Sequence, residues 1–242
     1  MHSFVIRIAN CNISINTPFK MPREYFVDFL SNENPQIQIF LDECDISKRI
    51  AVKGEKSEEL GWQGSIDTSI VLQKIADELI DYHTFLIHGA AIAIDNSAYI
   101  FIAPSGTGKT THIQKWLDNN KDVFVINGDK PFVQITDQSA ALVYGSPWSG
   151  KEGQYTNTVV PLKAIIALQR AEKNVMKPVS FVDIFPDLLH QIYRPENIAK
   201  MHATLDLLKK LIPNTSFYRF YCNNFADDCF DVAYNTLVRG ER

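Results

Sequence analysis

A glycine-rich segment carries the residue types that bind phosphate. It reads Ala103-Pro104-Ser105-Gly106-Thr107-Gly108-Lys109-Thr110, which matches the P-loop pattern with alanine in place of the first glycine. Gly106 and Gly108 permit backbone angles that a side chain would forbid, so neighbouring N–H groups can converge on phosphate oxygens. The helix expected after the loop would add about +0.5 of an elementary charge at the same point. The spacing therefore predicts a nucleotide-binding loop.

The polar residues of this segment have distinct expected roles. Lys109 would bring a full positive charge to the β- and γ-phosphates, and Thr110 would place its hydroxyl on Mg²⁺. Thr111 would reach the α-phosphate, and the rest of the cradle would be formed by Ser105, Gly106, Thr107 and Gly108. Such a loop binds phosphates rather than the base, so the pattern leaves ATP and pyrophosphate open as donors.

A carboxylate is expected at the end of a strand near such a loop. The apolar run 123–126 is followed by Asn127-Gly128-Asp129, so Asp129 could hold Mg²⁺ directly or through water. The alternative is an aspartate that only forms the turn. The Asn-Lys-x-Asp motif of GTPases, the Leu-Ser-Gly-Gly-Gln motif of transporter ATPases and the His-Arg-Asp and Asp-Phe-Gly motifs of eukaryotic-type kinases do not occur.

Composition narrows the remaining classes of function. The 242 residues include 24 basic and 28 acidic side chains, a net charge of -4, which argues against a nucleic-acid-binding protein. The four cysteines form no C-x-x-C pair, as expected for reduced thiols. No signal peptide and no apolar run of ~18 residues is found, so we expect a cytoplasmic protein without a membrane partner.

The pattern of apolar and polar residues predicts an α/β fold with a β-rich beginning. We expect one domain over 1–242, with a β-rich part at 1–66 and a nucleotide-binding core at 67–242. The expected strands are 4–8, 13–15, 37–41, 85–94, 99–103, 123–126, 132–135, 141–144, 162–168 and 217–221. The expected helices are 23–30, 67–82, 109–117, 181–193, 196–211 and 226–238. Loops are expected over 52–66 and 146–161, a turn at Asp95-Asn96, and a cap and a stop for the last helix at Asn224 and Gly240.

Several stretches resemble one known family. The stretch Phe85-Leu86-Ile87-His88-Gly89-Ala90-Ala91 and the phosphate-binding segment are similar to the kinase domain of HPr kinase/phosphorylase and to the nucleotide site of ATP-dependent phosphoenolpyruvate carboxykinase. In particular, the chain resembles small stand-alone HPr-kinase-like proteins of bacteria, including lasso-peptide kinases. Further similar stretches are 127–131, 144–151, 160–165 and 193–195.

The resemblance implies a P-loop kinase domain with a mixed sheet. It implies ATP and Mg²⁺ as cofactors, and phosphoryl transfer to a Ser or Thr hydroxyl of a peptide or small protein. A small-molecule acceptor is the nearest alternative, and a homo-oligomer is a further expectation from the relatives. His88 would stand where the relatives carry an active-site histidine, near the metal or the transferring phosphoryl group, whereas a buried core histidine is the other interpretation.

One position departs from the family's pattern. The relatives usually carry two consecutive aspartates at the turn, and here the first is Gly128. Asp129 would then serve as both metal ligand and base, or the base lies elsewhere, or the chain is an ATP-binding regulator without turnover. If the missing carboxylate alone limits activity, Gly128→Asp should raise phosphoryl transfer.

Two further cations are candidates for the site. Lys151 could reach the γ-phosphate or an acidic substrate, and Arg194 could clamp phosphate or pair with carbonyls at a helix end. Trp148 could stack on a ligand or anchor its loop in the core. His112, one turn into the expected helix, is interpreted as a helix-face residue.

Overall fold

The structure is a computed structural model that describes residues 2–17, 23–45 and 63–240. The chain divides into two compact units, residues 1–82 and 83–242. The boundary lies after the first long helix rather than before it, where the sequence placed it. The prediction of one domain over the whole chain stays a prediction.

The first unit is built on a four-stranded sheet of order β3-β1-β2-β4. Strands β1 (His2–Ile8) and β2 (Cys11–Thr17) form an antiparallel hairpin whose turn residues Ala9 and Asn10 have positive φ, as two-residue hairpin turns require. The 3₁₀ helix η1 (Arg23–Phe29) precedes β3 (Leu30–Ser31), and β4 (Ile37–Phe40) runs parallel to β2.

Helix α2 (Gln63–Leu79) contacts strands β2 and β4 of this sheet and continues into the 3₁₀ turn η3 (Ile80–Tyr82). Its apolar residues recur at helical spacing and are buried, which confirms that predicted helix, although it begins four residues early. The loop expected over 52–66 lies outside the described residues up to position 62, and its last residues belong to α2.

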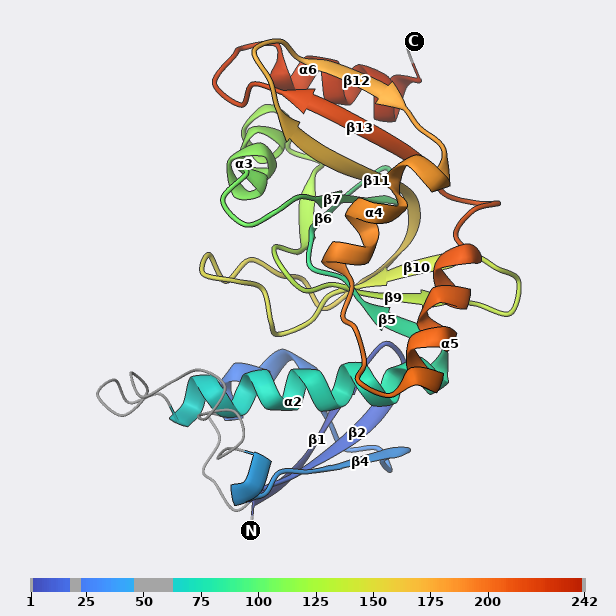
Figure 1. Cartoon of the computed structure of the whole chain (residues 1–242). Coiled ribbons are helices and arrows are strands. Elements are labelled where there is room, and N and C mark those ends of the chain that lie inside the picture. Colours follow the sequence, from blue (N-terminus) through green and yellow to red (C-terminus); the bar gives the residue numbers. More distant parts are fainter. Residues whose placement is uncertain (1, 18–22, 46–62, 241–242) are drawn as a thin grey trace. The chain divides into compact units, whose positions relative to one another are not determined.

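The second unit is built on a nine-stranded mixed sheet (Figure 1). Its path runs β5-β9-β10-β11-β7-β6-β8, with β13 beside β11 and β12 beside β13. The strands are β5 (Thr84–Leu86), β6 (Ala90–Ile94), β7 (Ser97–Ile102), β8 (Phe124–Asn127), β9 (Phe132–Ile135), β10 (Ala141–Tyr144), β11 (Val159–Arg170), β12 (Val175–Pro178) and β13 (Ser216–Cys222). The fold is therefore α/β with a mixed sheet, as expected.

Strand β11 joins the two halves of the sheet. Its first residues pair antiparallel with β10, and the rest pairs parallel with β7 on one side and β13 on the other. It starts at Val159, inside the loop expected over 146–161, because the backbone there finds a partner in β10. Sequence alternation alone could not show this partner, and it also gave no sign of β12.

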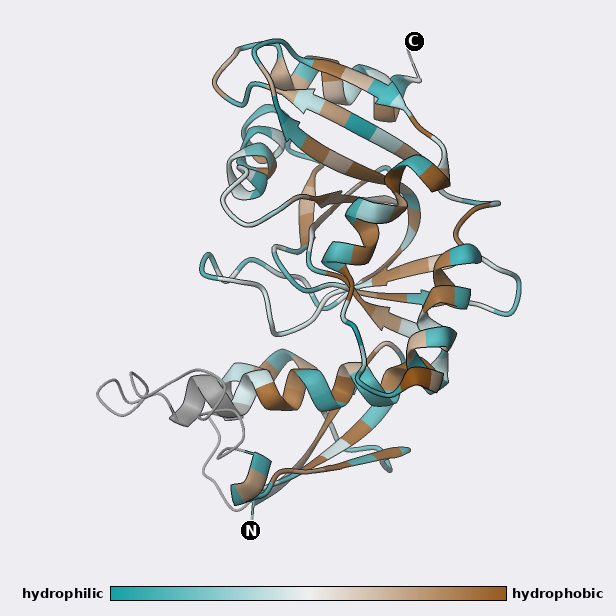
Figure 2. Ribbon diagram, viewed as in Figure 1, coloured by the Kyte–Doolittle hydropathy of each residue, from teal (hydrophilic) through white to brown (hydrophobic). Residues whose placement is uncertain are grey.

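Helices cover both faces of the parallel strands. Alternate residues of β7 and β11 pack with helix α4 (Phe181–Gln191) and helix α5 (Ile198–Lys209) in one core cluster. The residues between them pack with helix α3 (Lys109–Asn119) and helix α6 (Cys229–Tyr234) in another. Figure 2 shows hydrophobic residues along these strands and hydrophilic residues in the connecting loops.

The strand expected over 85–94 is wrong as a single element. It is broken at His88-Gly89 into β5, which pairs with β9, and β6, which pairs with β7 and β8. A side chain at Gly89 would come within 3.0 Å of the Phe101 carbonyl oxygen, so the chain passes very close to β7 here. The expected turn at Asp95-Asn96 is confirmed, with φ of 49° and 54°.

The last helix differs from its prediction at its start. Asp228 rather than Asn224 precedes α6, and a π-helical segment (Asn235–Arg239) continues it. Asn224 instead donates a hydrogen bond to the Gly108 carbonyl oxygen at 3.0 Å. Gly240 ends the helix with φ 71°, as expected.

Candidate functional site

The glycine-rich segment lies between β7 and the N-terminus of α3. Gly106 and Gly108 have φ of 78° and 112°, in the left-handed region that favours glycine. Gly108 is the N-cap of α3, and no side chain caps the first turn of the helix. The N–H groups of a first turn lack acceptors within their helix, so this end of α3 is available to an anion.

The residues predicted to bind phosphate surround this helix end. Ser105, Gly106, Thr110 and Thr111 are exposed, and Thr107, Gly108 and Lys109 are partly buried. The Lys109 ammonium group folds back over the loop and donates to the Ala103 carbonyl oxygen at 2.7 Å. Partial burial lowers the pKa of Lys109, an effect that the charge of Asp129 opposes and that of Lys130 reinforces. The loop lysine and the predicted carboxylate therefore interact electrostatically.

Asp129 is the centre of a cluster of polar side chains. One carboxylate oxygen lies 3.1 Å from His88 Nε2, and the other lies 2.7 Å from Lys130 Nζ. Burial alone would raise the pKa of Asp129, but hydrogen bonds from His88 and Lys130, together with their charges, lower it to about 2. Asp129 is therefore ionised at neutral pH and is a weak base in this arrangement.

Backbone hydrogen bonds hold His88 in place. Its N–H donates to the Gln191 carbonyl oxygen at 2.6 Å, and the N–H of Gly89 donates to the Asp129 carbonyl oxygen at 3.0 Å. The break between β5 and β6 thus carries His88 to the Asp129 turn. His88 is half-buried and lies beside Asp129, so it is not a buried core histidine, and its role in the site stays a prediction.

The turn that presents Asp129 is fixed by a buried amide. Asn127 Oδ1 accepts hydrogen bonds from the N–H groups of Asp129 and Lys130, at 2.8 and 2.6 Å. Asn127 Nδ2 donates to the carbonyl and hydroxyl oxygens of Ser146, at 2.9 and 3.0 Å. Asn127 therefore links the turn to the loop that follows β10.

That loop passes directly over Gly128. The N–H of Gly128 donates to the Gln154 carbonyl oxygen at 3.0 Å. A Cβ atom at this position would lie 2.9 Å from the Ser149 carbonyl oxygen and 3.4 Å from that of Gln154. The glycine is thus required by a close approach of two backbone segments. The expected gain of activity in Gly128→Asp is at odds with this packing.

The predicted cations and the tryptophan have different placements. Lys151 is exposed on a loop tip, next to Gly150, where a Cβ would lie 3.1 Å from the Asp129 Cβ. Arg194 is exposed just after Tyr193, whose N–H donates to the Leu86 carbonyl oxygen at 2.9 Å. No hydrogen bond joins either cation to another described residue, so their roles stay predictions. Trp148 is 6% exposed and anchors its loop.

Two residues of the site were missed in the sequence. Lys130 binds Asp129, and its position next to the aspartate was the available signal. Arg170, at the end of β11, donates through Nε to the Thr107 carbonyl oxygen at 3.1 Å and through a terminal nitrogen to that of Gly106. Nothing in the sequence near Arg170 indicates this contact, because 63 positions separate it from Thr107.

Known proteins resemble this chain in structure rather than in sequence. No family model matches the chain, and no curated protein matches it. Among solved structures, the HPr(Ser) kinase/phosphatase from Coxiella burnetii is similar. The TM-score is 0.40 and the sequence identity 10%, over 64% of this chain and 88% of that one. At this TM-score the likeness carries no argument about the activity of this chain.

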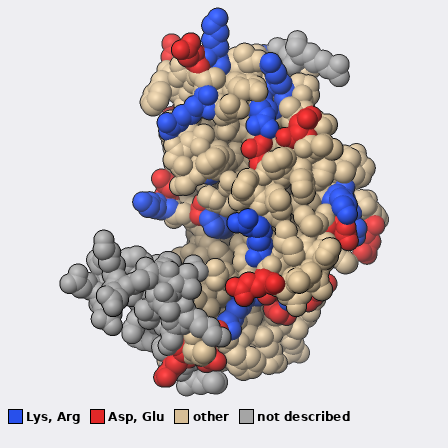
Figure 3. All heavy atoms as spheres, in the orientation of Figure 1, with Lys and Arg blue, Asp and Glu red and all other residues tan. Residues whose placement is uncertain are grey.

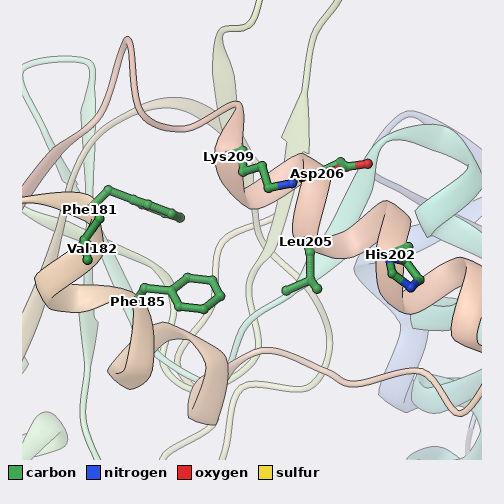
Figure 4. A pocket seen from close by; sticks show the side chains of 7 residues that line it. All are labelled: Phe181, Val182, Phe185, His202, Leu205, Asp206 and Lys209. Carbon is green, nitrogen blue, oxygen red and sulfur yellow. Dashed lines mark hydrogen bonds and ion pairs between the residues drawn. The ribbon is translucent and has the colours of Figure 1, made fainter.

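A hollow lies between α4 and α5, with a volume of about 250 Å³. It is lined by Phe181, Val182, Phe185, His202, Leu205, Asp206 and Lys209 (Figure 4). The lining is largely apolar, with Asp206 and Lys209 paired at 2.8 Å. None of the predicted site residues takes part in it.

The surface charge and the helices of the described residues can be compared with what nucleic acids and membranes require. On the face shown in Figure 3, basic and acidic side chains of the described residues are interspersed. Among these residues, no helix combines the length and the apolar character needed to cross a bilayer.

Proposed function

We propose that this chain binds ATP with Mg²⁺ and transfers the γ-phosphoryl group to a hydroxyl. The observation that carries the proposal is the uncapped N-terminus of α3, where the chain places Lys109. The ionised Asp129 supports it, because its charge acts on Lys109. A phosphoryl-transfer site needs backbone donors and a cation for the phosphates, together with a carboxylate for the metal. The acceptor class, Ser or Thr of a peptide or small protein, rests on the resemblance of the sequence to HPr-kinase-like proteins.

The residues present fit a magnesium ion that arrives with the phosphates. Mg²⁺ is usually held by one or two protein oxygens together with substrate phosphates and water. Asp129 offers an ionised carboxylate and Thr110 an exposed hydroxyl. Among the described residues, no group of three or more His, Cys, Asp or Glu side chains could hold a metal by itself. When bound, the ion would neutralise charge on the β- and γ-phosphates.

The chain's own residues would act mainly by position and charge. Lys109 and the first-turn N–H groups of α3 would bind the phosphates, and His88 would orient Asp129. In the transfer, the acceptor oxygen forms a bond to the γ-phosphorus as the bond to the bridging oxygen breaks. ADP leaves and the hydroxyl proton passes to water. Because such transition states are largely dissociative, a strong base contributes less than charge neutralisation.

A regulator that binds ATP without turnover is the second candidate. General bases work best with a pKa near the working pH, whereas that of Asp129 is about 2. Gly128 also leaves no space for a second carboxylate without movement of the adjacent loop. These two observations favour the regulator if no acceptor can be found.

The first test measures ATP binding with Mg²⁺ by calorimetry in wild type, Lys109→Ala and Lys121→Ala. We expect Lys109→Ala to weaken binding roughly 10- to 100-fold, as for the loss of a charged hydrogen bond. Lys121 is exposed beyond α3 and serves as the matched control. Equal affinity in wild type and Lys109→Ala would contradict the proposal.

ADP formation in the same samples separates the two candidates. Peptides containing Ser or Thr are added as acceptors, with water as the reference. Peptide-dependent ADP formation that Lys109→Ala abolishes supports a kinase. Binding without any ADP formation supports the regulator.

A further inference from the structure

Arg170 stands at the mouth of the phosphate-binding loop. A hollow of about 440 Å³ is lined there by residues 104–107 of the loop and 168–170 of β11. Strand β11 runs parallel to β7, and Ala167 pairs with Ile102, the last residue of β7. The three residues that follow Ala167 therefore extend beside the loop that follows Ile102. This register places the Arg170 guanidinium against the loop.

The guanidinium binds the loop through two backbone carbonyls. Its Nε donates to the Thr107 oxygen at 3.1 Å, and a terminal nitrogen donates to the Gly106 oxygen. Among the described residues, no carboxylate pairs with Arg170. The contacts of this cation are thus directed to the loop, although its side chain is exposed.

These two contacts determine where the loop's N–H groups point. A peptide group is planar and trans, so its carbonyl and the following N–H point in opposite directions. The Gly106 carbonyl shares a peptide with the Thr107 N–H, and the Thr107 carbonyl shares one with the Gly108 N–H. With both carbonyls turned to Arg170, both N–H groups face away from it. Among the described residues, the one hydrogen bond of the Thr107 N–H is long, at 3.3 Å to the Pro104 oxygen.

We propose that Arg170 is a positioning residue that holds the Thr107 and Gly108 N–H groups in place for a polyphosphate ligand. The inference rests on the proposed function, because it concerns the same loop. It adds a residue that is far from the loop in the sequence and that raises the affinity of the loop for its ligand. An arginine suits this task, since its planar fork can serve two carbonyls at once, whereas a lysine donates from a single point.

The test compares wild type with Arg170→Gln, Arg170→Lys and Arg219→Gln. Arg219, on neighbouring β13, binds a carbonyl and a carboxylate on α4 and does not touch the loop, so it is the matched control. Calorimetry measures the dissociation constants of ATP with Mg²⁺ and of pyrophosphate with Mg²⁺. Thermal unfolding of the ligand-free proteins is measured in parallel.

We expect Arg170→Gln to weaken both ligands by the same factor, about 10-fold, the loss typical of a charged hydrogen bond. Arg170→Lys should recover only part of this loss, and Arg219→Gln should bind as wild type does. The number of sites per chain should stay unchanged, because a positioning role alters affinity and not the folded fraction.

Several results would overturn the inference. If Arg170→Gln bound both ligands as tightly as wild type while Lys109→Ala lost binding, the role proposed for Arg170 would be wrong. The proposed nucleotide site would still stand. Full recovery in Arg170→Lys would assign the effect to charge alone. Fewer sites per chain, with a melting temperature well below that of Arg219→Gln, would indicate a structural role. If wild type binds neither ligand, the proposed function fails and this inference fails with it.

Discussion

Asp129 shows how neighbours set the chemistry of one residue. His88 and Lys130 each bind one of its carboxylate oxygens, and together they outweigh the effect of burial on its pKa. The pKa of Asp129 in the folded protein is below its ordinary value of 3.8, so the ionised carboxylate stabilises the folded state. This stabilisation is fully present above pH 3.8 and is lost as the pH falls through about 2. At neutral pH, Asp129 thus acts as a fixed negative charge, suited to a metal ion or a cation.

Substitutions at Gly128 can separate the effect of close packing from the effect of a missing carboxylate. Gly128→Ala and Gly128→Asp each introduce the Cβ atom that would lie 2.9 Å from the Ser149 oxygen. We expect both variants to melt below wild type and neither to form ADP faster, because the loop over the turn must move in each. Thermal unfolding and ADP formation measure the two effects.

The two variants control for each other, because only one carries a carboxylate. If Gly128→Asp turned over faster than both Gly128→Ala and wild type, the missing carboxylate would be the limiting factor. The packing explanation would then be wrong.

At the scale of elements, helix α3 is anchored by a buried aromatic group. His112 on this helix accepts a hydrogen bond from Trp116 Nε1 at 3.1 Å and packs edge-on against Phe101 and Phe220. Burial lowers the pKa of His112 to about 4, mainly because the charged form would lose its water. The sequence indicated a helix-face residue at His112, whereas the structure places it in the core, fully buried.

The lowered pKa of His112 leads us to expect that the free energy of unfolding depends on pH. Between pH 6.5 and about 4 the unfolded chain binds a proton at His112 and the folded chain does not, so stability falls as the pH falls. The loss should amount to about 3 kcal/mol across this window. Urea unfolding of wild type and His112→Gln over the same range measures it, because glutamine keeps an acceptor but does not titrate.

The exposed His202 supplies the control for this measurement. His202→Gln should follow the wild-type pH dependence, whereas the curve of His112→Gln should be flatter. Parallel curves for wild type and His112→Gln would show that His112 is protonated equally in both states, contrary to the expectation.

At the scale of the whole molecule, the chain consists of two compact units. Every residue proposed for phosphate, metal or phosphoryl chemistry belongs to the second unit. Two core clusters, one on each face of the parallel strands, are formed entirely by residues of that unit. The second unit therefore contains both a core and the candidate site.

A truncated chain tests whether this unit is independent. We expect residues 83–242 to unfold cooperatively and to bind ATP with Mg²⁺ about as tightly as the full chain. Circular dichroism during thermal unfolding and calorimetry are the measurements. An unfolded or aggregated fragment would instead support the single domain predicted from the sequence.

The sequence by itself determined the features that depend on neighbouring residues. Positive φ at Gly106 and Gly108, the turn at Asp95-Asn96 and the start of α3 at Lys109 follow from backbone freedom and hydrogen bonding over a few positions. The same local rules predicted the buried strand β7 before the loop and the strand β8 after helix α3. These features were therefore predictable without knowledge of which strands pair.

Only the tertiary structure decided which distant residues meet. The contacts of His88 with Asp129 and of Arg170 with Thr107 depend on strand partners and register. The close packing at Gly128 depends on a loop that returns from another strand. A shift of one residue in register would turn these side chains to the opposite face. Which strands are partners, such as β7 and β11, is decided by segments far apart in the sequence. The loop could thus be predicted from its motif, whereas the cluster around it required the fold.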